Sequence, residues 1–189
     1  MRIYLAGPDV FCPDPLARAA TLKAICARHG LTGISPLDPI VDMPAAWLAL
    51  PLARRIALCN ETHIRAADAV VANLTPFRGP SADVGTVFEI GFMRALDRPV
   101  FGWTNAGATF LARTLGFVGA ATPAEDGGWR DNEGMLLEAF DMHDNLMIDG
   151  AILASGGQIF AANIPYAERW TDLSMFERCI TAAAHHANG

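Results

Sequence analysis

Glu89 is the residue whose type and surroundings most strongly suggest chemistry. It lies in a stretch, residues 84–96, for which the apolar pattern predicts a helix. On a helix, the neighbours three and four positions from Glu89 include no cation; they are Gly85, Thr86, Phe92 and Met93. A carboxylate on such a face is either exposed at the surface or held against a pocket that uses its ionisation and nucleophilicity. The spacing Thr86-x-x-Glu89 also fits a capping box, which would give Glu89 a structural role only.

Asp83 is the second candidate, because it directly precedes the same predicted helix. An aspartate at that place most often caps the helix N-terminus. Its functional alternative is to accept hydrogen bonds from a sugar or alcohol ligand. Gly85 and Gly91 would allow a ligand or a neighbouring strand to approach this helix closely. The spacing alone leaves both roles of Asp83 open.

An alternation of strands and helices must position these residues. The expected strands cover residues 3–6, a segment ending near 36, 68–74 and 99–103. The expected helices cover about 16–30, 53–66 and 84–96. This order predicts a single α/β domain over residues 1–189, a flavodoxin-like or Rossmann-like doubly wound parallel sheet with helices on both faces. Ligands bind at the carboxyl ends of such strands, so the loops after the first and third strands form the expected pocket.

The rest of the chain is less regular. We expect a loop over residues 36–51, of a length typical of lids. A polar, Gly-rich segment covers residues 122–131, a helix is expected over 135–142, and a closing helix over 166–186. The pattern assigns no role to residues 152–166.

The composition excludes several functions. Lys plus Arg number 14 against 20 Asp plus Glu, and the resulting charge of -6 argues against a nucleic-acid backbone as partner. The dinucleotide fingerprint G-x-G-x-x-G and the P-loop motif are both absent. The four cysteines are scattered, and His63, His185 and His186 lack other metal ligands nearby in sequence. We therefore expect no metal and no organic cofactor.

Apolar residues are unusually abundant. They make up 52% of the chain, and charged residues only 18%, where about 25% is typical. Apolar runs break before the roughly 18 to 20 residues that a membrane span needs, and the run at the start is too short for a signal peptide. We expect a cytoplasmic protein that buries apolar surface between subunits.

Four segments, taken together, resemble the nucleoside 2-deoxyribosyltransferase family. They are Ile3-Tyr-Leu-Ala-Gly-Pro, Asp68-Ala-Val-Val-Ala-Asn-Leu-Thr-Pro-Phe-Arg-Gly, Asp83-Val-Gly-Thr-Val-Phe-Glu-Ile-Gly-Phe and Asn145-Leu-Met-Ile. They follow the family's order between about residues 2 and 150. No single segment is decisive, but four in order are specific.

The resemblance implies that Glu89 is a nucleophile that attacks the anomeric carbon of a 2-deoxyribonucleoside. The base leaves, a covalent deoxyribosyl-enzyme remains, and a second base attacks it. Two inversions then retain the configuration, as in retaining glycosidases. The implied partners are a 2-deoxyribonucleoside and a free nucleobase, and the implied role is nucleotide salvage.

The resemblance also implies roles for other residues. Tyr4 would orient Glu89 through its hydroxyl, Asp83 would bind sugar hydroxyls, and Gly7 would border the substrate. Asn145 and Met147 match a segment that a neighbouring subunit contributes, with Asn145 on the sugar and Met147 packing nearby. The active site would then exist only in a homo-oligomer, a dimer or a trimer of dimers.

Asn60 departs from the family pattern. Several members have an aspartate at this place that serves the nucleobase. An amide can hydrogen-bond a base edge but cannot act as a general acid. Protonation of the leaving base must then come from water, from Glu61 or from another carboxylate.

Two other functions remain open at this point. A nucleoside or nucleoside 5'-monophosphate N-glycosidase would cleave the same bond with water. Such an enzyme for phosphorylated substrates would need Ser or basic groups near the 5' position, where the chain has Ser81 but also the anionic Asp83. A non-catalytic nucleotide-binding module would keep the pocket without turnover.

Overall fold

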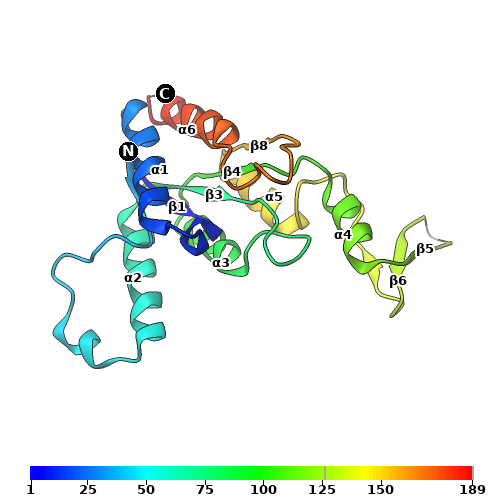
Figure 1. Cartoon of the computed structure of the whole chain (residues 1–189), viewed down its shortest axis with the longest axis horizontal. Helices are drawn as coiled ribbons and strands as arrows, with labels where there is room; N and C mark the ends of the chain where they lie inside the picture. Colours follow the sequence, from blue (N-terminus) through cyan, green and yellow to red (C-terminus); the bar gives the residue numbers. More distant parts are fainter. Residues whose placement is uncertain (126, 189) are drawn as a thin grey trace.

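A five-stranded parallel sheet forms the centre of the protein, with strand order β2-β1-β3-β4-β8 (Figure 1). The computed structural model describes residues 1–125 and 127–188. The strands of this sheet are β1 (Arg2–Ala6), β2 (Thr32–Ile34), β3 (Ala69–Asn73), β4 (Val100–Thr104) and β8 (Ile159–Ala161). The helices are α1 (Pro15–Arg28), α2 (Leu52–Ala66), α3 (Val84–Ala95), α4 (Phe110–Val118), α5 (Leu146–Ala154) and α6 (Ser174–Asn188), with short 3-10 helices η1 (Pro8–Phe11) and η2 (Ala45–Ala49).

Helices cover both faces of this sheet. Alternate side chains of β1 point to opposite faces, so Ile3 and Leu5 pack against α1 and α6. Tyr4 and Ala6 pack on the other face, with buried residues of α2, α3 and α5. Every residue of β3 is buried, as expected for a parallel strand that is covered on both sides. The predicted doubly wound α/β fold is confirmed.

The order of the strands reverses between β1 and β3, which pair in parallel with Tyr4 opposite Val70. The chain leaves β1 into η1 and leaves β3 into a turn before α3. Both loops therefore lie at the carboxyl edge of the sheet, at the point where α/β folds bind ligands.

The structure corrects the prediction for residues 135–142. These residues form no helix; Leu136–Leu137 is strand β7 of a second, antiparallel sheet of order β5-β6-β7, with β5 at Ala121–Pro123 and β6 at Trp129–Asp131. The Asp131 carboxylate accepts the N–H groups of Glu133 and Met135, each at 2.9 Å. This turn, with Gly134 at a φ of 79°, sends the chain back along β6.

The closing helix is shorter than predicted. It begins at Ser174, whose N–H donates to the Asp172 carboxylate at 2.8 Å, and residues 166–171 form turns. Residues 152–166, which the pattern left without a role, complete α5 and supply the edge strand β8. No helix among the described residues is both long and apolar enough to cross a bilayer.

Candidate active site

Tyr4 and Glu89 meet beneath the carboxyl edge of the sheet. Tyr4 lies on β1 and is fully buried, while Glu89 lies on α3, the helix that packs on the same face. The Tyr4 hydroxyl donates to Glu89 Oε1 at 2.5 Å. Among the described residues no other group donates to this carboxylate, so its second oxygen is free to react. The structure thus brings together two of the predicted catalytic residues.

The environment of Glu89 favours the uncharged carboxyl. The pKa of its carboxyl is raised from 4.5 to about 7, because burial and, to a smaller extent, the negative charge of Asp83 raise it more than the hydrogen bond from Tyr4 lowers it. Burial and the neighbouring carboxylate also raise the pKa of Tyr4, which keeps its proton on the hydroxyl. Near neutral pH, therefore, the protonated and the ionised forms of the Glu89 carboxyl are both populated.

Asp83 caps α3. Its carboxylate accepts the N–H groups of Gly85 at 3.1 Å and Thr86 at 3.2 Å. The capping-box alternative for Thr86 and Glu89 is therefore wrong, because the helix starts at Val84 and Glu89 lies well inside it. Capping uses Oδ2 of Asp83, and the residue is only partly buried. Its other oxygen can still accept a hydrogen bond from a ligand.

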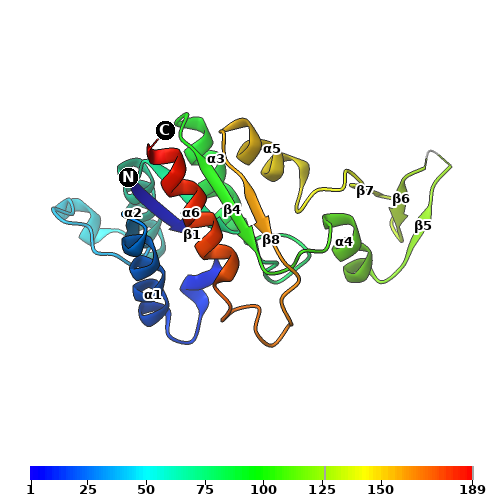
Figure 2. The ribbon, with the colours of Figure 1, turned by 90° about the horizontal axis from the view of Figure 1, so that it is seen from above.

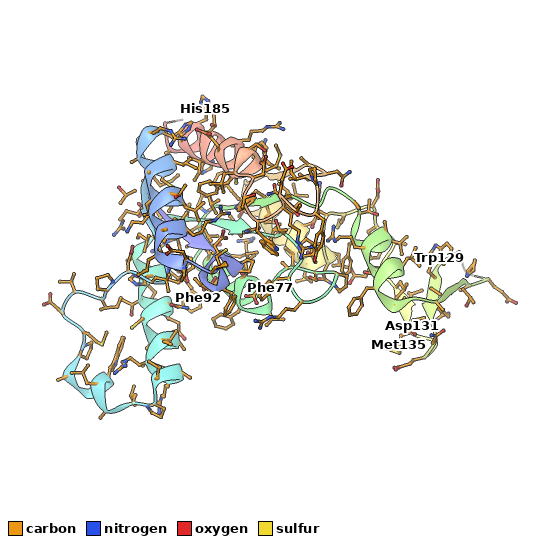
Figure 3. The ribbon with its side chains drawn as sticks, viewed as in Figure 1. Phe77, Phe92, Trp129, Asp131, Met135 and His185 are labelled. Carbon is orange, nitrogen blue, oxygen red and sulfur yellow. The ribbon has the colours of Figure 1, made fainter. Side chains whose placement is uncertain are left out.

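A hydrogen bond and a pair of stacked rings join the loops that follow β1 and β3. Asn73 at the end of β3 donates to the Asp9 carboxylate at 2.9 Å. Phe77, in the loop after β3 (Figure 3), stacks on Phe11 with 5.3 Å between the ring centroids. Gly7 has a φ of 154°, and a Cβ there would lie 2.6 Å from Asn73 Cβ. Close packing of the two loops is thus sufficient reason for glycine at this position.

Asn60 lies on α2, which runs beside α3 on the same face of the sheet (Figure 1). Its Oδ1 atom is shielded from solvent and has no hydrogen-bond partner among the described residues. A buried amide oxygen without a donor costs stability in the free protein. Such an atom is suited to accept a hydrogen bond from a ligand.

Asn145 and Met147 lie at the start of α5, and the groove that they line does not include Tyr4 or Glu89. Asn145 caps that helix, since its Oδ1 accepts the Met147 N–H at 3.0 Å and its amide donates to Glu138. Both residues line a groove of about 700 Å³ between α3 and α5. Met147 is 71% exposed. Within one copy, therefore, Met147 faces the outside of the molecule, and Asn145 is half-buried beside it.

A buried polar network that no sequence pattern predicts anchors the turn before Asp83. The Asp144 carboxylate accepts the Ser81 hydroxyl and the Ala82 N–H, which fixes the turn before Asp83. Arg113 of α4 donates to this carboxylate at 3.5 Å and to the carbonyls of Pro80, Ala108 and His143. Three of these four partners, Pro80, His143 and Asp144, lie 30 or more residues from Arg113 in the sequence, so no local pattern predicts the network.

Among the described residues, no group of three His, Cys, Asp or Glu side chains is placed to hold a metal ion.

Comparison with known proteins places these residues in a family. The model of the family described as nucleoside 2-deoxyribosyltransferase matches residues 3–147. An uncharacterized protein of Schizosaccharomyces pombe is 28% identical over 165 residues, which cover 82% of this chain and 78% of the relative. The matched region contains Tyr4, Asp83, Glu89 and Asn145.

Two solved structures share the fold. The 2-desoxiribosyltransferase from Leishmania mexicana is 28% identical, with a TM-score of 0.57 over 78% of this chain and 84% of its own. A conserved protein from Enterococcus faecalis is 21% identical, with a TM-score of 0.52 over 90% of this chain and 96% of its own, and supports the fold alone. The chain belongs to the nucleoside 2-deoxyribosyltransferase family, whose enzymes act on nucleosides and nucleobases.

Proposed function

We propose that this protein transfers 2-deoxyribose between nucleobases through a covalent intermediate on Glu89. The observation that carries the proposal is the half-buried Glu89 carboxylate, which accepts the Tyr4 hydroxyl on one oxygen and has no partner among the described residues on the other. A desolvated anion is a stronger nucleophile than a hydrated one, and a single fixed hydrogen bond orients it. Membership of the family supplies the substrate class.

The reaction would proceed in two displacements. Glu89 attacks C1' of the nucleoside, the C1'–N bond breaks, and its electron pair leaves with the base, which takes up a proton. A nitrogen of the second base then attacks C1' from the vacated face and gives up its proton to the water or carboxyl group that protonated the first base. The ester bond breaks, its electron pair returns to Glu89, and the configuration at C1' is retained.

The neighbouring residues would bind and orient the substrate. The Tyr4 hydroxyl keeps the reacting carboxylate in place, and the free oxygen of Asp83 accepts a sugar hydroxyl. The unpartnered Oδ1 of Asn60 accepts a donor on the base edge. Because Asn60 cannot protonate the leaving base, water or a carboxyl group such as Glu61 supplies that proton.

The site would be completed by a second copy of the chain. Met147 is exposed and Asn145 is half-buried beside it, at the rim of the groove between α3 and α5, where a neighbouring copy could meet them. Asn145 would bind sugar hydroxyls in the neighbour's pocket, and Met147 would pack beside them.

Hydrolysis of a nucleoside 5'-monophosphate is the rival within the same chemistry. Two observations weigh against it. Ser81 already donates its hydroxyl to Asp144, and the charge of Asp83 would repel a phosphate. These residues favour an unphosphorylated nucleoside.

Incubation of deoxyinosine with and without adenine tests the proposal, with products separated by chromatography. We expect deoxyadenosine to form only when adenine is present, and Glu89→Ala to abolish its formation. Base release at the same rate with or without adenine would instead show a hydrolase. Binding without any turnover would show a nucleotide-binding module.

A further inference from the structure

A second cavity, which we call the α1–α6 cavity, lies at the carboxyl edge of the sheet and has a volume of about 280 Å³. Its walls come from η1 and the chain before α1, from the turn after β3, and from the chain before α6; they include Phe11, Phe77, Arg78, Arg169 and Trp170. Figure 2 shows the blue chain before α1 beside the orange chain before α6. Helices α1 and α6 cover the face of the sheet opposite α3, and neither Tyr4, Asp83 nor Glu89 lines this cavity. The cavity is therefore separate from the candidate active site.

Three aromatic rings form one wall of the α1–α6 cavity. Phe11 stacks on Phe77 with an angle of 8° between the ring planes, and Trp170 meets Phe77 edge to face, with 6.1 Å between the centroids. Phe11 is 55% exposed, so the protein itself does not cover this cluster of rings. A flat ring of a ligand can stack on such a surface.

Two arginines complete the lining. Arg78 Cζ lies 4.6 Å from the ring centroid of Phe77 and 5.2 Å from that of Phe11. Arg169 Cζ lies 4.9 Å from the ring centroid of Trp170. A cation–π contact holds a guanidinium in place but leaves its N–H donors for an anion. The rings thus present two oriented cations to the cavity.

The described residues offer these cations no anionic partner. No Asp or Glu lines the cavity, and neither Arg78 nor Arg169 forms an ion pair within the described part of the chain. The carboxylates before α1 are engaged elsewhere, since Asp9 accepts a hydrogen bond from Arg18 at 2.7 Å and Asp14 caps α1. Arg169 Nε is shielded from solvent and has no acceptor among the described residues. Because a buried donor without an acceptor costs stability, an anionic ligand oxygen would be bound favourably there.

The backbone holds both arginines in position. Arg78 has a φ of 57°, in the left-handed region that residues other than glycine adopt at a cost in free energy. The buried Asn105 amide donates to the carbonyls of Arg169 and Asp172 at 2.8 and 2.9 Å, which fixes the chain before α6. Strained backbone of this kind is concentrated at ligand sites, and most ligand pockets are formed before the ligand binds.

We propose that the α1–α6 cavity binds a nucleoside 5'-monophosphate, with its phosphate on Arg78 and Arg169 and its base against the aromatic rings. A phosphate accepts charge-assisted hydrogen bonds from guanidinium groups, and nucleobases stack on aromatic side chains. The volume lies close to the lower limit of small-molecule pockets, roughly 300 Å³. This size favours a mononucleotide over a dinucleotide.

The charge of Asp83 separates this ligand from the substrate of the active site. It repels a phosphate, so a nucleotide would bind at the two arginines and not beside Glu89. The nucleotide would then be a ligand of the protein without being its substrate. The choice of a nucleotide among anions that carry a flat ring rests on the proposed function, whereas the anion site itself does not.

Isothermal titration calorimetry with deoxyadenosine 5'-monophosphate tests the proposal. The titrated protein carries Glu89→Ala, so that no turnover contributes heat. We expect Arg78→Gln and Arg169→Gln, each added to this protein, to weaken binding at least about tenfold, because each removes charge-assisted hydrogen bonds. Arg28→Gln is the matched control; it removes an exposed guanidinium at the other end of α1 and should leave the affinity unchanged.

Two further measurements separate the contribution of the base from that of the phosphate. Inorganic phosphate should displace the nucleotide only at concentrations at least about tenfold higher, because it cannot stack on the rings. Phe11→Leu should weaken nucleotide binding at least about fivefold. Circular dichroism checks that every variant is folded, and the exposed position of Arg78 keeps the test valid if Arg169→Gln fails to fold.

Three results would overturn the proposal. They are the absence of nucleotide binding at concentrations on the order of 1 mM, an affinity that neither arginine substitution lowers, and an affinity to which the base contributes nothing. Failure of this site and failure of the proposed function are distinguishable. The titration uses a protein without the nucleophile, whereas the wild-type protein should form deoxyadenosine from deoxyinosine and adenine with no phosphate present.

Discussion

Removal of the Tyr4 hydroxyl should move the pH dependence of the reaction to higher pH. Glu89 must be ionised to attack, and its pKa is about 7 because burial raises it more than the Tyr4 hydrogen bond lowers it. Tyr4→Phe deletes the interaction that lowers the pKa and keeps the ring in the core. The pKa of Glu89 should therefore rise.

The size of the shift follows from the strength of the hydrogen bond. A hydrogen bond to a charged group contributes about 1.5 to 3 kcal/mol, and one pKa unit corresponds to about 1.4 kcal/mol. Allowing for relaxation of the site, a rise of about one unit is expected. The ionised fraction of Glu89 at pH 7 would then fall from about one half to about one tenth, and kcat/KM would fall about fivefold.

The assay is the rate of base exchange at limiting nucleoside between pH 5 and pH 9. Wild-type kcat/KM should rise through a midpoint near 7, as the pKa of Glu89 indicates. The Tyr4→Phe midpoint should lie about one unit higher, with activity largely recovered at pH 9. Tyr166→Phe is a matched control, because Tyr166 is the other tyrosine of the chain and is 77% exposed. A midpoint that stays in place or moves to lower pH would refute the reasoning.

Other predictions concern the same site and its supports. Glu89→Gln should stabilise the protein increasingly as pH rises. The folded pKa of about 7 lies above the ordinary 4.5, so the wild type loses stability as pH rises through this interval. The gain in the free energy of unfolding over the wild type, from urea titrations, should grow by about 3 kcal/mol between pH 4.5 and pH 8; a gain independent of pH would contradict it. Asp144→Asn removes the buried anion beside Arg113 and should lower the free energy of unfolding by about 3 kcal/mol. It should also raise KM for the nucleoside more than it lowers kcat, because the turn before Asp83 loosens; unchanged stability and KM would contradict this role. Glu89→Ala and Asn145→Ala should each be inactive alone, and their mixture should regain about a quarter of wild-type activity, since half the pairs hold one intact site. A mixture that remains inactive would show that the sites are not shared.

The parts of the fold that the sequence predicted are those with strong local patterns. Strands β1 and β3 are apolar runs that end at turn residues, and α3 follows a capping aspartate. The small antiparallel sheet escaped prediction because its strands are too short for alternation to show and lie in a polar, Gly-rich segment. The apolar residues 135–137 suggest a helix, but Leu136 and Leu137 form strand β7.

The features of the site also differ in how far the sequence predicts them. The capping role of Asp83 can be predicted from its position alone, because the N–H groups that it caps lie two and three residues further along the chain. The contact between Tyr4 and Glu89 joins residues 85 positions apart, and only the family resemblance indicated it. The network of Arg113 and Asp144 had neither signal, because its hydrogen bonds join loops that meet only in the folded chain.

The covalent intermediate is the central claim, and mass spectrometry of the intact protein tests it most directly. Acid quenching shortly after mixing with a 2-deoxyribonucleoside should reveal a protein heavier by one deoxyribosyl group. Trypsin cuts after Arg78 and Arg94, so the added mass should lie on the peptide of residues 79–94, which contains Glu89. Glu89→Gln should show none. Base exchange at full rate with no adduct, or with an adduct on a different peptide, would contradict the account.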